Sequence, residues 1–197
     1  MGYADFFKVG KSKKVKARSS TIRHTVFKNL IPWIEPCDAE IKRALELLEM
    51  SDDDVRCVYC GGEATTLDHI YASVDNKKPT GYTNEIANLV PCCQTCNASR
   101  GNKTWKEWLL YGKSPKAPRT RGVRNLEEKA NVIENYIRTM KPQKISIKEL
   151  LGDEKYNECI KKMEEVIEML NCLDGICMEN QNIVRNKINE KRKQSKY

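Results

Sequence analysis

Four cysteines in two pairs are the residues of this 197-residue chain whose spacing points most directly to chemistry. Cys57 and Cys60 form one Cys-x-x-Cys pair, and Cys93 and Cys96 form the other. A two-residue gap lets a tight turn present both sulfur atoms to one metal ion, and four thiolates complete a tetrahedral zinc shell. The sequence therefore predicts a structural Zn²⁺ held by these four side chains. Cys92 is an alternative to Cys93, although it would leave a three-residue gap before Cys96.

The residues between and after the two pairs predict the elements that must position them. Residues 65–71 are rich in β-forming residues and predict a strand, while residues 72–87 are polar and turn-prone. Residues 88–91 predict a short returning strand, after which the pattern becomes helical. A break at Gly101 precedes a second short helix over 103–111. A zinc ion would tie the predicted hairpin to the first of these helices.

The order of polar residues in this centre resembles the HNH (His-Asn-His) endonucleases of the ββα-metal fold. It is most similar to the branch with four zinc cysteines and an Asp-His opening, which includes phage junction-resolving nucleases and some restriction enzymes. The resemblance covers about 50 residues and implies an α+β fold with a small zinc-stabilised core between mainly helical flanks. The matching motifs are Asp68-His69-Ile70, Asn88-Leu89-Val90-Pro91 and Cys93-x-x-Cys96-Asn97-x-x-Arg100-Gly101.

The resemblance implies a catalytic role for four polar residues. His69 would be the general base, Asp68 and Asn97 would hold a catalytic Mg²⁺ or Mn²⁺, and Asn88 would hold the loop that orients His69. The chemistry agrees, because a neutral imidazole can accept the proton of a water near neutral pH and hard cations prefer oxygen ligands. Neighbouring side chains of a strand point to opposite faces. Asp68 and His69 can therefore serve one site only if the strand bends or the site lies at its edge.

Charge divides the chain into segments. The formal net charge is +8, but residues 1–34 carry a net +7 and residues 35–56 a net −5. We expect the first segment to be an extended basic arm, because like charges this close repel each other. The second is a helical connector. The nuclease core then covers residues 57–112, and a basic loop follows at 113–123.

Basic side chains in three places are expected to contact DNA phosphates, because such contacts release counterions. The alternatives are that the arm is only a solvated tail and that the basic loop is only a linker. The residues predicted to contact DNA are Lys13, Lys14 and Lys16 in the arm, Arg100 and Lys103 beside the site, and Lys113, Lys116, Arg119 and Arg121 in the loop.

Hydrophobic spacing predicts helices outside the core. Asp38 can cap the first of them, and Gly175 is expected to separate the last two. The helical C-terminal region, residues 124–197, is either a small bundle or a seam between two copies of the chain. The predicted helices cover residues 38–50, 126–140, 156–170 and 176–193.

Together these features predict a metal-dependent DNA endonuclease that hydrolyses phosphodiester bonds. The resemblance implies 5′-phosphate and 3′-hydroxyl ends, and a role in restriction, defence or a mobile element. We expect double-stranded DNA as the partner, and a homodimer because cutting both strands needs two active sites. No membrane span or secretory signal is expected, so the location would be the cytoplasm of a bacterial or phage-infected cell. The alternatives are a non-catalytic zinc module that binds nucleic acid, a branched-DNA resolving nuclease, or a subunit that needs another protein.

Overall fold

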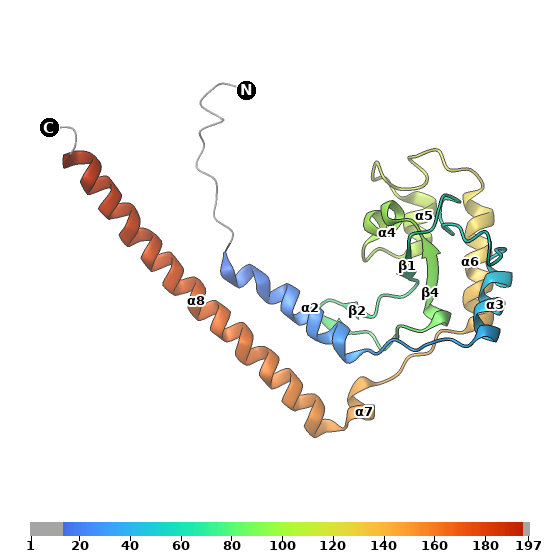
Figure 1. Cartoon of the computed structure of the whole chain (residues 1–197), viewed down its shortest axis with the longest axis horizontal. Coiled ribbons are helices and arrows are strands. Elements are labelled where there is room, and N and C mark those ends of the chain that lie inside the picture. Colours follow the sequence, from blue (N-terminus) through green and yellow to red (C-terminus); the bar gives the residue numbers. More distant parts are fainter. Residues whose placement is uncertain (1–13, 195–197) are drawn as a thin grey trace. The chain divides into compact units, whose positions relative to one another are not determined.

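The computed structural model describes residues 14–194, and the contacts within it divide the chain into two compact units (Figure 1). One unit comprises residues 27–150 and contains both cysteine pairs. The other joins residues 14–26 to residues 151–194.

A two-stranded antiparallel sheet lies at the centre of the larger unit. β1 (Thr66–His69) pairs with β4 (Leu89–Cys92), and α4 (Gln94–Arg100) follows β4 directly and packs on β1. Gly101 ends α4 with a φ of 54°, a left-handed conformation that glycine adopts without steric cost. The order strand, strand, helix agrees with the prediction, and the α+β fold class is confirmed.

A second, smaller hairpin interrupts the connection between β1 and β4. β2 (Val74–Asp75) pairs with β3 (Lys78–Pro79). Asn76 and Lys77 between them both have positive φ, as a two-residue hairpin turn requires. η2 (Ile86–Asn88), a 3₁₀ turn, then leads the chain back to β4. The region expected to be a loop therefore contains regular structure.

Three helices pack around the sheet. α6 (Leu126–Met140) contacts both α3 (Asp38–Leu47) and α5 (Trp105–Tyr111), and it begins and ends at the predicted residues. Cys37, and not Asp38, is the N-cap of α3. The core buries the two tryptophans of α5. Its fully or almost fully buried side chains include Val58, Tyr59, Ile70, Val90, Trp105, Trp108, Leu109, Ile133 and Tyr136.

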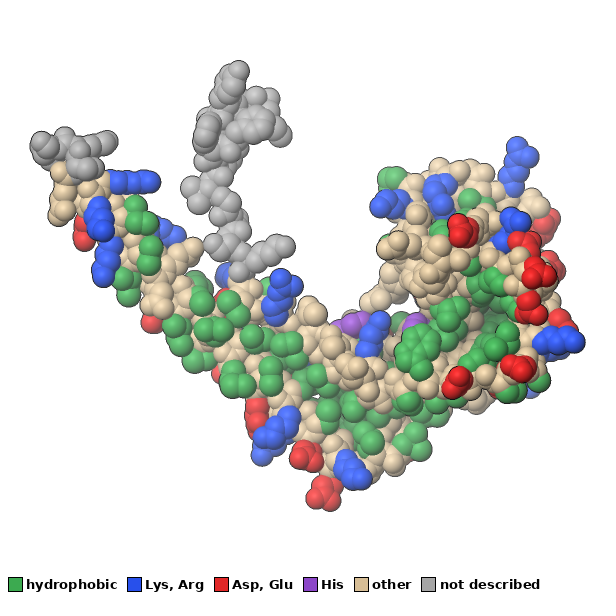
Figure 2. All heavy atoms as spheres, in the orientation of Figure 1, with side chains coloured by type: hydrophobic (Ala, Val, Ile, Leu, Met, Phe, Trp, Pro, Cys, Tyr) green, Lys and Arg blue, Asp and Glu red, His purple; other side chains and the backbone are tan. Residues whose placement is uncertain are grey.

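The second unit is helical. η1 (Val15–Arg18) lies along α8 (Asp153–Gln194), where the backbone N–H of Val15 donates to Oδ1 of the buried Asp174 at 2.7 Å. Figure 2 shows hydrophobic side chains along much of the surface of α8. Even so, none of the described helices, α8 included, has a stretch apolar enough to cross a bilayer.

The flanks differ from the prediction in two places. The basic arm is not extended in its described part, because η1 and α2 (Ser19–Leu30) make it helical. Acidic side chains of α8 offset the repulsion there, since Arg23 forms an ion pair with Glu164. Gly175 does not end a helix either, because it lies inside α8, which is 42 residues long. A short helix, α7 (Ile147–Leu151), precedes α8.

Substitution of Gly175 by alanine is expected to stabilise the protein. A Cβ at this position would meet no atom within 4 Å, and alanine is favoured over glycine inside a helix by about 0.5–1 kcal/mol. The free energy of unfolding, measured by urea denaturation followed by circular dichroism, should rise by about that amount. Gly101→Ala is the matched control and should lower it, because its backbone is left-handed.

Candidate active site and metal centre

The four predicted zinc cysteines meet at one point of the larger unit. The sulfur atoms of Cys57, Cys60, Cys93 and Cys96 all lie within 4.8 Å of one another. A tight turn after the first pair presents its sulfurs, with a left-handed Gly61 that donates its N–H to the carbonyl of Cys57 at 2.7 Å. Four sulfur donors with this spacing fit a tetrahedral zinc site. Within residues 14–194, this is the one group of three or more such side chains that could hold a metal ion.

Cys92 does not belong to this group. Its side chain is 0 % exposed in the core, and burial raises the pKa of its thiol to about 12. Hydrogen bonding between Cys57 and Cys96 instead lowers the pKa of Cys57 and raises the pKa of Cys96, because the two thiols are close enough to share a proton. Arg121 adds a positive charge, since its Nη2 donates to Sγ of Cys96 at 2.8 Å. The alternative of Cys92 as a ligand is therefore excluded by position.

Asp68 lies in a buried polar network. Its Oδ1 accepts a hydrogen bond from Nη1 of Arg100 at 2.5 Å, and its Oδ2 accepts one from the hydroxyl of Tyr59 at 2.9 Å. Burial raises the pKa of Asp68, and the charge of Arg100 opposes that shift. Burial also holds the pKa of Tyr59 well above its usual value, so the phenol remains a donor.

The role expected of Arg100 changes accordingly. Only 4 % of its surface is exposed, and its Nη2 donates to the carbonyl of Ile70 at 3.0 Å. A guanidinium buried in this way holds β1 and α4 together rather than meeting a DNA phosphate. Nothing in the sequence indicates this role, because an arginine after a pair of zinc cysteines could equally be a surface cation.

His69 is held by Asn84, a residue outside the motifs that the sequence indicates. Its Nε2 lies 2.6 Å from Oδ1 of Asn84, whose Nδ2 donates to the carbonyl of Ile31 at 2.9 Å. Because that second bond fixes the amide orientation, Oδ1 can only accept, and Nε2 of His69 must carry the hydrogen. Nδ1 is then left with a lone pair. Burial lowers the pKa of His69, with a smaller contribution from Lys28, so the imidazole is neutral at pH 7.

The two other predicted asparagines bond to the backbone of β1 or of the residues that follow it. Asn88 is fully buried, and its side chain accepts from the N–H of Tyr71 at 2.9 Å and donates to the carbonyl of Tyr71 at 3.0 Å. These are the contacts that holding the loop after His69 would require. Asn97, on α4, donates from Nδ2 to the carbonyl of Leu67 at 3.3 Å. Its amide oxygen has no hydrogen-bond partner within the described part of the chain.

Of the other basic residues predicted to contact DNA, some bond to groups of the protein itself and some are exposed to solvent without such a bond. Lys103 is exposed, and its Nζ donates to the last carbonyls of α4 at 3.1 and 3.3 Å. Lys16 lies 4.0 Å from Asp174, and Arg119 donates to the carbonyl of Leu110 at 2.9 Å. Exposed positions without such contacts are held by Lys14, Lys113 and Lys116, and Lys13 lies outside the described residues.

A cleft of about 370 Å³ opens beside the C-terminal end of α4. Tyr71 and Tyr82 line it with stacked rings whose centroids are 4.4 Å apart, and Nζ of Lys144 lies 5.1 Å from the Tyr82 centroid. Lys103 lines the same cleft. Aromatic rings and amines together are the groups that bind bases and phosphates of nucleic acids.

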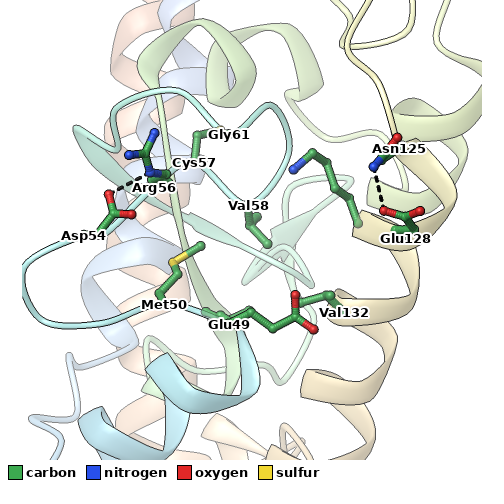
Figure 3. Close-up of a pocket in the computed structure, with 12 residues that line it drawn as sticks. Glu49, Met50, Asp54, Arg56, Cys57, Val58, Gly61, Asn125, Glu128 and Val132 are labelled. Atoms are coloured by element: carbon green, nitrogen blue, oxygen red, sulfur yellow. Dashed lines mark hydrogen bonds and ion pairs between the residues drawn. The ribbon is translucent and has the colours of Figure 1, made fainter.

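The hollow in Figure 3 lies beside Cys57 and has a volume of about 230 Å³. Its charged groups bond mostly to their own neighbours. Arg56 donates to Asp54 at 2.6 Å, and Asn125 donates to Glu128 at 2.7 Å. We therefore assign no ligand to it.

Comparison with known proteins agrees with this geometry. Residues 57–103 match the model of the HNH endonuclease family, which points to a nuclease acting on nucleic acid. The resemblance inferred from the cysteines, the Asp-His pair and the asparagines is confirmed for this segment. No curated protein and no solved structure matches the chain.

Removal of Cys93, but not of Cys92, is expected to abolish metal binding. Cys93→Ala takes one of four ligands from the cluster, and metal-binding free energy is also folding free energy at such a site. Bound zinc, measured by plasma mass spectrometry after purification, should fall from one ion per chain to none, and the melting temperature should fall with it. Cys92→Ala is the matched control and should retain one zinc ion. Zinc loss in both variants, or in neither, would contradict the assignment.

Removal of Arg100 is expected to destabilise the fold strongly. Arg100→Met would leave the buried Asp68 carboxylate without its cation, which typically costs about 3–5 kcal/mol. Urea denaturation should report a loss of that size, and the double variant with Asp68→Asn should recover part of it. Lys106→Met, which breaks an exposed pair with Glu134, should change stability little. Equal effects of the two single variants would show that the buried pair is unimportant.

Proposed function

We propose, from the premise that residues 57–103 form an HNH endonuclease domain, that this protein hydrolyses phosphodiester bonds of DNA with His69 as the general base. The observation that carries the proposal is the contact between His69 and Asn84. It leaves a neutral imidazole with its Nδ1 lone pair available, which is the protonation state that a base needs.

In the proposed reaction, Nδ1 of His69 accepts a proton from a water molecule as that water attacks the phosphorus. The bond from phosphorus to the 3′ oxygen breaks, and that oxygen takes a proton from a solvent water, which leaves a 5′-phosphate and a 3′-hydroxyl. Asn84 keeps the ring in place throughout, and its carbonyl oxygen stabilises the imidazolium that forms, because Nε2–H donates to it more strongly when the ring is charged. Asn88 holds the backbone that follows His69.

A Mg²⁺ or Mn²⁺ ion is proposed to be held by Asp68 and Asn97. The donors suit a hard cation, since one is a carboxylate and the other an amide oxygen. Asp68 already accepts from Arg100 and Tyr59, but an ionised carboxylate has about four lone-pair sites, so two remain. When bound, the ion would neutralise charge on the phosphate and on the leaving oxygen.

Double-stranded DNA is the proposed substrate. The cleft beside α4 offers Lys103 and Lys144 with two tyrosine rings, and it begins one helical turn from Asn97. Exposed Lys113 and Lys116 would add phosphate contacts. We further propose that two copies of the chain act together on the two strands. Restriction, defence or a mobile element, in the cytoplasm of a bacterial or phage-infected cell, is the proposed context.

Replacement of His69 is expected to stop cleavage without removing the zinc. His69→Ala should slow nicking of supercoiled plasmid in Mg²⁺ or Mn²⁺ by about 10²–10⁴-fold, which is the usual contribution of a general base. The measurement is gel electrophoresis of the plasmid over time, with zinc content as the check of folding. His24→Ala, which removes the other histidine, should cut at the wild-type rate.

Two outcomes would overturn this proposal. Unchanged cutting by His69→Ala would exclude His69 as the base. Wild-type protein that binds DNA but never cuts it would instead indicate a non-catalytic zinc module. Branched DNA in a parallel reaction distinguishes a resolving nuclease, which would cut the branch in preference to the duplex.

A further inference from the structure

An apolar stripe runs along the exposed surface of α8 (Figure 2). Its members are 40–64 % exposed, whereas large apolar side chains in a folded protein are mostly buried. The stripe consists of Val166, Met169, Leu173, Ile176 and Ile183, with Val184 and Ile188 beside its far end.

The spacing of this stripe is that of a coiled-coil seam. From Val166 the steps to Met169, Leu173 and Ile176 are three, four and three residues, and the next two steps reach Asn180 and Ile183. Alternating steps of three and four define a heptad repeat, in which alternate positions are called a and d. Val166, Leu173 and Asn180 then occupy a positions. The d positions are held by Met169, Ile176 and Ile183. These three a/d pairs, which span about two and a half heptads, need a partner helix to cover them.

The partner is not found in the described part of the chain. Met163, Ile167 and Asp174 form the buried face of α8, and Asp174 contacts η1 there. At about 100° per residue that face lies roughly a third of a turn away from the stripe. Every described residue of α8 beyond Asp174 is exposed. A long solvated helix is stabilised mainly by packing of its apolar face, so contact along the stripe would stabilise this half.

We propose that the stripe is the interface with a second copy of this chain, in a parallel two-stranded coiled coil. Asn180 is the observation that selects this occupant. A buried asparagine is costly unless its amide is hydrogen-bonded, and a parallel, in-register pair brings each Asn180 opposite its own copy. Two identical amides can then donate and accept reciprocally. A different partner would have to supply a matching polar group at the same depth, whereas a second copy supplies it by symmetry.

The test measures mass and does not depend on nuclease activity. Sedimentation equilibrium of the full chain should give a dimer at micromolar concentration. Leu173→Glu/Ile183→Glu places charges at one a and one d position, and should weaken the dimer by roughly 100-fold or more. Met178→Glu is the matched control, because Met178 is 50 % exposed but lies on the opposite side of α8 from the stripe. It should remain a dimer.

Asn180 provides the decisive second variant. Asn180→Val should tighten the dimer, because a polar residue at an a position costs stability while it specifies register. The dissociation constant should therefore fall, whereas a solvent-facing Asn180 would give no change. The proposal is overturned if the wild-type chain is still a monomer at a concentration 100-fold above the micromolar range. It is also overturned if the Leu173→Glu/Ile183→Glu variant remains a dimer. Failure of His69→Ala to affect cleavage would leave this result untouched.

Discussion

The larger unit depends on one constraint, the convergence of four sulfur atoms from two segments of the chain. Cys60 and Cys93 are 33 residues apart, yet their sulfur atoms lie 3.8 Å from each other. The second pair sits at the N-terminus of α4, where Cys93 is the N-cap and accepts from the N–H of Cys96 at 3.4 Å. A metal bound there would fix the start of α4 against the first knuckle. Since the sheet has only two strands, such a cross-link replaces much of the stability that a larger core would supply.

Two polar residues of α4 contact β1, and their distance along the helix from the cysteine pair determines which part of the strand each one meets. Asn97 comes one residue after the last cysteine and reaches the backbone of Leu67. Arg100, almost one turn later, reaches the buried Asp68. A buried ion pair is weak evidence for stability, because desolvation offsets much of its attraction. The effect of this ion pair is instead on the orientation of α4 against β1. It aligns strand and helix, and it means that any cation at Asp68 would share the carboxylate with a guanidinium.

Spacing alone predicted the features that depend on local chemistry. The spacing of the two Cys-x-x-Cys pairs predicts which four cysteines come together. The apolar periodicity of residues 126–140 predicts the first and last residues of α6. Side-chain partners brought together by the fold could not be predicted in this way. Arg100 looked like a phosphate contact because nothing near it in sequence is acidic, and its partner is 32 residues away. Gly175 looked like a break because its intrinsic helix propensity is low, but a cost of about 1 kcal/mol does not stop a 42-residue helix.

The strand geometry explains why Asn84 matters as much as the residues in the family motif. Asp68 and His69 are neighbours on β1 but have different partners, since Asp68 accepts from Arg100 of α4 and His69 bonds to Asn84. The orientation of His69 therefore does not come from α4. Asn84 orients the ring instead, and its own position depends on backbone contacts with Ile31 and Ile34, the latter at 3.0 Å. Those two residues lie before residue 57. The segment that matches the family thus contains the proposed base, but the amide that orients the base is fixed by chain outside it.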